Sequence, residues 1–311
     1  MARFRSLTSS LSQRRTSFAA RAAPVRYKTR SRQLSRRLHV KVLVVVQART
    51  GSTRLPGKVL MPLAGKPLLV RMLERLQAAR TPAQIVVATT TAASDDTVVE
   101  LAKQSGVACV RGHPTDLLDR HIAAARTTDC DAISKIPSDC PLIDPAVVDR
   151  IIGTFLEEPS YDYVSNLHPA TWPDGYDVEV MRRDTLETAW HEAKLPMERE
   201  HTTPFIWERP ERFKLKNVVW ERDLQMTHRL TIDYAEDYEL IRRVYDALYV
   251  EGKAPFGLQT ILDYLEAHPE VFALNQKFAG VNWYRHHLGE LKTVDASRTR
   301  VPEHERKAPP K

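Results

Sequence analysis

The chain has 311 residues and a formal net charge of +7 at pH 7, which is long enough for one large domain or two modest ones with a buried core. Residues 1–40 contain eleven Lys or Arg and no acid, which leaves 35 basic and 39 acidic residues, a net charge of −4, for the rest. The net acidic charge of residues 41–311 argues against a nucleic-acid-binding protein. No apolar run is long enough to span a membrane. Three cysteines without C-x-x-C spacing argue against a disulfide scaffold or a zinc site.

The basic segment at residues 1–40 is rich in Arg and Ser. Its composition is typical of a mitochondrial or plastid transit peptide. A disordered basic tail, or a start site placed too far upstream, explains the same composition. We therefore expect a cytoplasmic protein, or an organellar one if this leader is a targeting segment.

From residue 41 onward, apolar strand patterns alternate with amphipathic helix patterns. Continuous apolar runs predict buried parallel strands, and apolar residues at helical spacing predict helices that cover them. This alternation predicts an α/β fold built on a parallel, doubly wound sheet. The expected strands lie near residues 41–48, 84–90, 107–110 and 131–136, and the expected helices near 67–79, 95–104, from 116 and from 145.

The pattern changes after about Tyr161. Short strand candidates at residues 161–166, 177–181, 213–220 and 228–233 predict a mixed extension of the sheet. Two helices are expected at about Asp237–Tyr249 and Leu258–Ala267. The resulting domain spans residues 41–285, and residues 286–311 are expected to form a disordered polar tail.

The first predicted strand leads into the loop "QARTGSTRLPGK" (residues 47–58). This loop differs from the P-loop of nucleoside triphosphatases. Five residues separate Gly51 from Gly57 where the P-loop has four, and Val59 offers no hydroxyl group for Mg²⁺. Clustered cations with flexible glycines nevertheless favour polyphosphate binding over an ordinary solvated loop. The side chains that suit this role are Arg49, Ser52, Arg54 and Lys58.

Two aspartates follow predicted strands and are candidate Mg²⁺ ligands. Asp139 lies in "KIPSDCPLIDP" after the fourth strand, and Asp233 ends "RLTID". Asp139 alone fits an Asx-turn equally well, and Asp233 alone could be a helix N-cap, a metal ligand or both. Asp144, which precedes Pro145, is best explained as an N-cap. Together, Asp139 and Asp233 offer the two oxygen ligands that a Mg²⁺-nucleotide site commonly uses.

A further polar cluster lies between these two aspartates. Asp177 and Glu179 share one strand face by their spacing of two, and Arg199, Glu200 and His201 stand at an expected helix start. Such residues are often a solvent-facing strand side or a structural histidine. The pattern alone leaves both explanations open.

Five segments occur in this order along the chain: "VVVQARTGSTRLPGKVLMPLAGKPLL", "SDCPLIDP", "PDGYDVEV", "REHTTPFI" and "LTIDYAEDYELI". Together they resemble the bacterial cytidylyltransferases of spore-coat polysaccharide synthesis, which are similar to the acylneuraminate and 3-deoxy-manno-octulosonate cytidylyltransferases. The resemblance covers roughly Lys41 to Tyr249. It implies a nucleotide-diphospho-sugar transferase fold, a Rossmann-like three-layer α/β/α domain with a mixed sheet.

The resemblance also implies a reaction, the transfer of CMP from CTP to a sugar or sugar acid with release of pyrophosphate, and a homodimer in which residues 165–205 form a dimer or substrate arm. Each role in the family is assigned to the residue of this chain that stands at the matching position of the motif. The implied phosphate-binding residues are Arg49, Lys58, Arg54, Gly51 and Ser52; the implied Mg²⁺ ligands are Asp139 and Asp233; the implied acceptor residues are Asp177, Glu179, Arg199, Glu200 and His201; and the nearest matches to the cytosine pocket are Ala48 and Asp95.

Two residues depart from the family pattern. Ser138 stands where glycine is usual, and its Cβ could narrow the approach to the nucleotide. Lys135 stands where arginine is expected, which is not equivalent at a bidentate phosphate contact. Two alternatives therefore stay open at this point, a glycosyltransferase of the same fold that consumes a nucleotide-sugar and a catalytically silent nucleotide-fold binding protein.

Overall fold

The computed structural model describes residues 40–81, 83–158 and 160–306. These residues belong to one compact unit. None of their helices is both long enough and apolar enough to cross a membrane. The predicted basic leader of residues 1–40 lies outside the described residues, apart from Val40.

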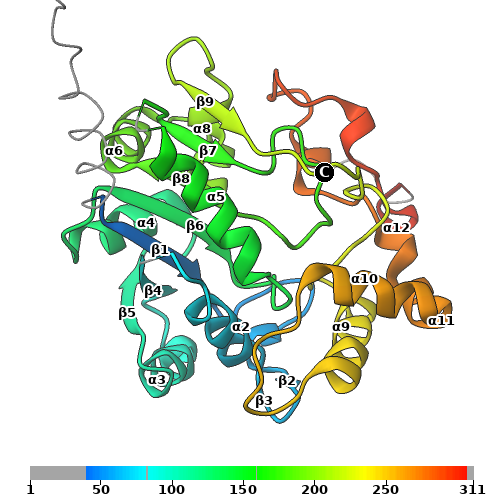
Figure 1. Cartoon of the computed structure of the whole chain (residues 1–311). Helices are drawn as coiled ribbons and strands as arrows, with labels where there is room; N and C mark the ends of the chain where they lie inside the picture. Colours follow the sequence, from blue (N-terminus) through cyan, green and yellow to red (C-terminus); the bar gives the residue numbers. More distant parts are fainter. Residues whose placement is uncertain (1–39, 82, 159, 307–311) are drawn as a thin grey trace, which may run out of the picture. The chain divides into compact units, whose positions relative to one another are not determined.

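Seven strands form the main sheet, in the order β5-β4-β1-β6-β8-β7-β9 (Figure 1). Strands β4, β1 and β6 run parallel to one another, and β5 runs parallel to β4. Strand β8 runs antiparallel to its two neighbours, so the predicted mixed sheet is confirmed. The strands are β1 (Val42–Gln47), β4 (Ala83–Thr90), β5 (Ala108–Gly112), β6 (Ala132–Pro137), β7 (Tyr163–Ser165), β8 (Glu179–Arg182) and β9 (Leu215–Asn217), with a separate pair β2 (Pro62–Leu63) and β3 (Lys66–Pro67).

Helices cover both faces of the sheet, which confirms the three-layer α/β/α architecture. One apolar cluster joins the sheet to α2, α3, α5, α9 and α10, and a second joins it to α4, α6, α7 and α8. Figure 1 shows α5 on the near face of the sheet. The helices are α2 (Leu68–Gln77), α3 (Asp96–Gln104), α4 (Leu117–Arg126), α5 (Pro145–Glu157), α6 (Arg183–Glu192), α7 (Pro196–His201), α8 (Pro204–Trp207), α9 (Ala235–Leu248), α10 (Leu258–Ala267), α11 (Pro269–Phe272) and α12 (Glu303–Arg306), with 3₁₀ turns η1 (Lys58–Leu60), η2 (Ala93–Asp95), η3 (Ala273–Phe278), η4 (Trp283–His286) and η5 (Ala296–Arg298).

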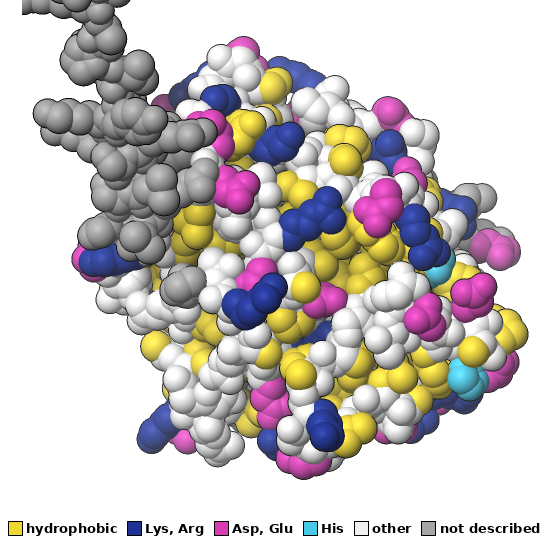
Figure 2. Space-filling model, in the orientation of Figure 1, with side chains coloured by type: hydrophobic (Ala, Val, Ile, Leu, Met, Phe, Trp, Pro, Cys, Tyr) yellow, Lys and Arg dark blue, Asp and Glu magenta, His cyan; other side chains and the backbone are white. Residues whose placement is uncertain are grey.

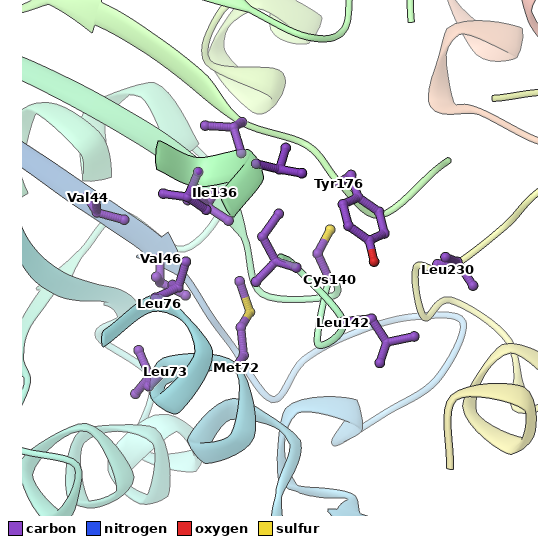
Figure 3. Packing of buried hydrophobic residues seen from close by; sticks show 14 of the residues in the cluster. Val44, Val46, Met72, Leu73, Leu76, Ile136, Cys140, Leu142, Tyr176 and Leu230 are labelled. Carbon is purple, nitrogen blue, oxygen red and sulfur yellow. The ribbon is translucent and has the colours of Figure 1, made fainter. Parts of the chain in front are cut away.

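The apolar run of β1 follows from its position between β4 and β6 in the middle of the sheet. Val44 and Val46 belong to the cluster on one face, and Leu43 and Val45 belong to the cluster on the other. Because successive side chains point to opposite faces, a central strand covered on both sides needs apolar residues at every position. Figure 3 shows Val44 and Val46 of this cluster near side chains from α2.

Helix signals in the sequence are largely confirmed. The Asp144 side chain accepts a hydrogen bond from the Ala146 N–H at 2.8 Å and caps α5, as predicted. Helices α9 and α10 lie within one or two residues of the expected bounds. Asp144 before Pro145 at the start of α5, and apolar residues at helical spacing in α9 and α10, were therefore sufficient signals in these places.

The strand predicted at residues 228–233 is wrong. Only an isolated bridge between Asp174 and Arg229 is present there. The Leu230 N–H donates to the Asp174 carbonyl at 2.7 Å, and the Ile232 N–H donates to the Asp139 carbonyl at 2.9 Å. Carbonyl groups of two loops therefore accept the backbone hydrogen bonds of this segment, and its Leu230 and Ile232 side chains are buried as they would be in a strand.

The tail predicted to be disordered from residue 286 is ordered up to Arg306. It carries η5 and α12, and it buries Leu291 and Thr299. Glu208 of the main domain accepts hydrogen bonds from the Lys292 and Thr293 N–H groups at 2.6 and 3.0 Å. The prediction of disorder relied on the polar composition of the tail, but these polar groups form hydrogen bonds with the domain. Residues 307–311 lie outside the described residues.

Residues 165–205, expected to form a dimer or substrate arm, are part of this domain. Within the range, β8 pairs with both β6 and β7 inside the main sheet. The homodimer stays a prediction. On the face in Figure 2, Lys and Arg side chains are interspersed with Asp and Glu and do not gather into a basic stripe, in keeping with the acidic body.

Candidate active site

A pocket of about 600 Å³ lies where β1 and β6 end. Ligands in open α/β sheets bind beyond the carboxyl ends of the strands, because the loops that follow the strands gather there. The pocket is lined by Leu117 and by residues within the ranges 47–58, 135–139, 166–179, 200–207, 225–233 and 281–287.

The loop after β1 brings Arg49, Arg54 and Lys58 to this pocket. Gly57 ends the loop with a φ of 69°, a left-handed conformation that glycine adopts without strain, and this turns the chain into η1. Lys58 is therefore the first residue of η1, and its side chain is buried at the base of the pocket, where it is only 9% exposed.

The Lys58 ammonium group joins the two predicted Mg²⁺ ligands. Its Nζ lies 3.0 Å from Asp139 Oδ2 and 3.1 Å from Asp233 Oδ1, and it also donates to the Ile232 carbonyl at 2.6 Å. Burial alone would lower the pKa of Lys58, but the two carboxylates outweigh it and raise the pKa above its ordinary value. Lys58 is therefore charged, and the two aspartates meet at one point.

Arg229 is the second cation at this point, and its guanidinium group pairs with three carboxylates. Its guanidinium group lies 2.9 Å from Asp174, 2.9 Å from Asp233 and 3.0 Å from Asp237, and it is almost fully buried. Burial would raise the pKa of Asp233, but Lys58, Arg54 and Arg229 hold it well below its ordinary value. Asp233 is therefore an ionised carboxylate across the physiological pH range.

The turn at Gly175 places two more carboxylates beside this cluster. A Cβ atom at Gly175 would stand 2.5 Å from the Leu230 carbonyl group, so only glycine allows the two chain segments to approach this closely. Burial raises the pKa of Asp174 to about 7, although Arg229 opposes this shift. Burial and the neighbouring Asp174 raise the pKa of Asp177 well above its ordinary value. The acids of this cluster are therefore not equivalent.

Lys135 and Glu179 form a buried ion pair across the sheet. They are register partners on β6 and β8, and the Tyr163 hydroxyl group donates to Glu179 at 2.6 Å. Burial opposes ionisation of Glu179, yet the Lys135 charge keeps its pKa below the ordinary value. Lys135, which stands where arginine is expected in the family, is thus paired with the Glu179 carboxylate.

Five aromatic and imidazole side chains form one side of the pocket, and we call them the aromatic wall. His201 stacks on Trp283 with ring centroids 3.7 Å apart, and His168 stacks on Trp207 at 4.1 Å. The Tyr284 hydroxyl group lies 3.4 Å from His168 Nδ1. Burial lowers the pKa of His168 to about 4 and that of His201 to about 3, so both imidazoles are uncharged at pH 7.

The structure brings most of the predicted site residues together in this pocket. The predicted residues that line it are Arg49, Ser52, Arg54, Lys58, Asp139, Asp177, Glu179, Glu200, His201 and Asp233. Ala48 and Gly51 do not line it. Ala48 is a core residue that is 1% exposed, and Gly51 faces solvent.

Asp95 and Arg199 are also absent from the pocket lining. The Asp95 carboxylate accepts hydrogen bonds from the Thr50 N–H at 2.8 Å and from the hydroxyl groups of Thr50 and Thr90, so it holds the loop after β1 in place. Arg199 pairs with Asp116 at 2.6 Å. Helix α7 thus directs Arg199 towards α4 and its neighbours Glu200 and His201 towards the pocket.

The family model described as cytidylyltransferase matches residues 43–261. The chain belongs to the cytidylyltransferase family. An uncharacterised protein of Methanocaldococcus jannaschii is 35% identical over 76% of this chain and 95% of its own length. An 8-amino-3,8-dideoxy-manno-octulosonate cytidylyltransferase of Shewanella frigidimarina is 34% identical over 73% of this chain and 84% of its own length.

A solved cytidylyltransferase structure from Leptospira borgpetersenii agrees with this assignment. It has a TM-score of 0.71 and 35% identity, and the alignment covers 75% of this chain and 97% of that one. This member of the cytidylyltransferase family is therefore a nucleotidyltransferase with the nucleotide-diphospho-sugar transferase fold. The pocket is the candidate active site.

The donor set of this cytidylyltransferase suits a hard divalent cation. Asp139 and Asp233 offer oxygen ligands, and both reach the same ammonium group, so one small cation can contact both. Among the described residues, no group of three or more His, Cys, Asp or Glu is arranged to hold a metal ion. The protein would therefore supply two ligands, with phosphate oxygens and water at the remaining positions.

Sequence reasoning missed Arg229, Asp174 and the aromatic residues of the C-terminal segment. Arg229 precedes an apolar alternation, which marked the segment as a strand and gave no sign of a buried cation. Asp174 and Gly175 stand in the segment "PDGYDVEV", but the approach of Gly175 to Leu230 that makes this turn important is a tertiary contact. Ser138 lines the pocket and is 7% exposed, so it does border the candidate nucleotide site.

Proposed function

We propose that this protein transfers CMP from CTP to a hydroxyl group of a sugar or sugar acid, with release of pyrophosphate, in a Mg²⁺-dependent reaction of glycan biosynthesis. The observation that carries the proposal is the meeting of Lys58, Asp139 and Asp233 at one point of the pocket. These residues come from three separate loops. Their convergence supports a role in binding a metal-nucleotide complex.

Arg49, Arg54 and Lys58 would bind the triphosphate. Arg49 has only one hydrogen bond in the described structure, to the Pro114 carbonyl at 3.0 Å, so most of its donors are open to phosphate oxygens. Phosphoryl and nucleotidyl transfers depend mainly on positioning and on neutralising charge. The three cations of this loop would neutralise the triphosphate and favour departure of pyrophosphate.

Asp139 and Asp233 would hold Mg²⁺. The bound ion would polarise the α-phosphate and orient the attacking hydroxyl group as a Lewis acid. Lys58 stands between the two carboxylates, so its ammonium group would turn towards the phosphate oxygens when the site is loaded. Arg229 would keep Asp233 ionised and correctly oriented.

The other end of the pocket would bind the acceptor. Asp177, Glu179, Glu200 and His201 line it together with the aromatic wall. The relative named as acting on an 8-amino-3,8-dideoxy-manno-octulosonate supports a sugar acid as the acceptor class. The homodimer expected from the resemblance is part of this proposal.

The test is a panel of CTP, UTP, ATP and GTP with Mg²⁺, measured first by thermal shift and then by pyrophosphate release with candidate sugars. We expect CTP to stabilise the protein most and to be the nucleotide consumed. A glycosyltransferase would instead release no pyrophosphate from CTP. No thermal shift with any of the four nucleotides would refute the proposal and favour a silent nucleotide-fold protein.

A further inference from the structure

Residues 273–281 pack against the loop that carries Asp233, and we call them the support segment. They comprise the 3₁₀ turn η3 and the three residues that follow it. The match to the family model ends at residue 261, before this segment begins. The Asp233 loop is therefore held by a part of the chain that lies outside the matched family domain.

Asn275 is the buried polar residue of the support segment. Its side chain is 0% exposed. Its amide group donates to the Arg229 carbonyl and to Asp237 Oδ1, each at 2.9 Å. A side-chain amide has two N–H donors, and both are used here. Asn275 thus bonds to the two residues that in turn contact Asp233.

Asp237 holds the main chain at Asp233. Its Oδ2 atom accepts hydrogen bonds from the N–H groups of Asp233 and Tyr234 at 2.9 and 3.0 Å. Its Oδ1 atom accepts from Arg229 at 3.0 Å and from Asn275. A shift of this carboxylate would therefore move the backbone from which the Asp233 side chain projects.

Arg229 holds the side chain of Asp233. Its Nη2 atom donates to Asp233 Oδ2 at 2.9 Å. The other carboxylate oxygen, Oδ1, contacts Lys58 and Arg54. The Nη1 atom of Arg229 donates to the Val281 carbonyl at 3.0 Å, so the support segment also bonds directly to this guanidinium group. Arg229 therefore fixes Oδ2 and leaves Oδ1 for a cation.

An aromatic stack is a separate contact between the support segment and this loop. The ring of Phe278 lies on the ring of Tyr234, with centroids 3.8 Å apart and planes 7° apart. Tyr234 directly follows Asp233, and Phe278 is buried. The stack therefore restrains the loop without any polar contact to Asp233 itself.

Resting on the proposed function, we propose that Asn275 and Phe278 are positioning residues for the divalent cation, which they serve by fixing the Asp233 carboxylate. Neither side chain lines the pocket, so neither would touch the cation or the nucleotide. Residues that orient metal ligands change metal affinity by about 10–100-fold when they are replaced, because the ligand loses its fixed position. The support segment therefore sets the affinity of the metal site in this chain.

The first test measures Mn²⁺ binding by EPR in the full-length protein without nucleotide, so the readout does not depend on turnover. Asn275→Ala should raise Kd for Mn²⁺ at least about tenfold, because the Asp237 carboxylate loses a donor. Phe278→Leu keeps an apolar side chain but removes the stack, and it should raise Kd about threefold.

The matched control is Leu291→Ala in the same C-terminal tail. Leu291 is buried in the second apolar cluster and lies outside the pocket lining. This substitution should lower Tm through lost burial and leave Kd for Mn²⁺ within about twofold. A general loss of stability is thereby distinguished from a loss of positioning.

The second test separates metal affinity from turnover. At saturating CTP, Asn275→Ala should need at least about tenfold more Mg²⁺ for half-maximal pyrophosphate release. Saturating Mg²⁺ should restore kcat to within about threefold of the unchanged protein, because all groups that would contact the substrates are still present. A purely structural role would lower Tm without shifting the Mg²⁺ requirement.

The outcomes separate this inference from the proposed function. If the unchanged protein binds no Mn²⁺, the proposed metal site and this inference are both refuted. If it binds Mn²⁺ and both variants have the same Kd within about twofold, the inference is refuted while the proposed function stands. If Asn275→Ala does not fold, the Kd of Phe278→Leu decides the question alone.

Discussion

Lys58 lies between Asp139 and Asp233, with its ammonium nitrogen 3.0 Å from one carboxylate and 3.1 Å from the other. The two aspartates depend on it to different degrees. Asp233 also pairs with Arg54 at 2.6 Å and with Arg229 at 2.9 Å, whereas Lys58 is the partner of Asp139 among the ion pairs of the described residues. This asymmetry allows the contribution of each carboxylate to stability to be separated from its contribution to activity.

Replacing either aspartate by asparagine should reduce pyrophosphate release at least about 100-fold, because each substitution removes a charged oxygen ligand. The effects on the free energy of unfolding should differ. Asp139→Asn should cost about 1 kcal/mol, whereas Asp233→Asn leaves buried cations unbalanced and should cost about 3 kcal/mol. Urea unfolding of both variants measures the difference. Full activity in Asp139→Asn would remove Asp139 from the metal site.

Lys58→Met should make the protein more responsive to Mg²⁺. Without the ammonium group, two carboxylates face each other with less compensation, so Tm should fall in metal-free buffer. Millimolar Mg²⁺ should then raise Tm more in the variant than in the unchanged protein, because the cation no longer competes with Lys58. The matched control is Lys66→Met, whose partner Glu74 lies outside the pocket lining. Equal Mg²⁺ responses in all three proteins would show that Lys58 and the metal do not share a position.

The layers of the fold could be predicted from the sequence because their signals are local. An apolar run such as Val42–Val46 indicates a strand covered on both faces, and Asp144 before Pro145 indicates a helix start. The sequence also pointed to Lys58 and Asp139, because polar residues that follow parallel strands must gather at one edge of the sheet. Asp233 was predicted there from a strand that does not form, and its segment reaches the site through loop contacts such as that of the Ile232 N–H with the Asp139 carbonyl.

The remaining features of the site depend on contacts that leave no local signal. Arg199 and His201 are two residues apart on a short helix, and only packing against α4 decides which of them faces the pocket. Arg229 acts through carboxylates from two other elements, Asp174 of the turn at Gly175 and Asp237 of the first turn of α9. Trp283 lies in a polar C-terminal stretch whose order comes from pairs such as Arg285 with Glu305.

Deleting residues 1–38 should leave kcat, KM for CTP and Tm unchanged. All the described residues that line the pocket lie between Gln47 and His287. The deleted segment carries 11 of the 46 Lys and Arg residues of the chain but none of these side chains. Steady-state kinetics and thermal unfolding of the truncated and full-length proteins make the comparison. A tenfold loss of activity would give the basic leader a role in the reaction.

His121 should make the protein sensitive to mild acid. It is fully buried in α4, its Nδ1 lies 2.7 Å from the Leu117 carbonyl, and burial lowers its pKa from 6.5 to about 4. The unfolded chain therefore binds a proton at pH 5 that the folded protein does not, so stability falls as pH drops from about 6.5 towards 4. This effect amounts to about 2 kcal/mol between pH 7 and pH 5.

The variant His121→Asn keeps a donor near the Leu117 carbonyl but cannot titrate. Its free energy of unfolding should therefore fall by about 2 kcal/mol less than that of the unchanged protein when urea denaturation is repeated at pH 5 instead of pH 7. The exposed His191, changed to Asn, is the control and should leave the pH dependence as it is. If the free energy of unfolding changes with pH equally in His121→Asn and in the unchanged protein, the prediction is contradicted.

Gly175→Ala should be the most disruptive small substitution near the site. Gly175 has a φ of 103°, and a Cβ atom there would stand 2.5 Å from the Leu230 carbonyl carbon and oxygen, both of which are backbone atoms that cannot move aside. The strained conformation and the clash should together lower the free energy of unfolding by about 3 kcal/mol. The turn would also move Asp174 away from Arg229, so activity should fall at least about tenfold.

The matched control is Gly153→Ala inside α5, where a Cβ atom meets no other atom within 4 Å. Alanine is the better helix former there, so this variant should gain about 0.5–1 kcal/mol and keep its activity. Urea unfolding and pyrophosphate release, measured on both variants, test the pair. If Gly175→Ala unfolds at the same urea concentration as the unchanged protein, the close approach of the turn to Leu230 does not hold Asp174 in place, and the pairing with Arg229 must rest on another contact.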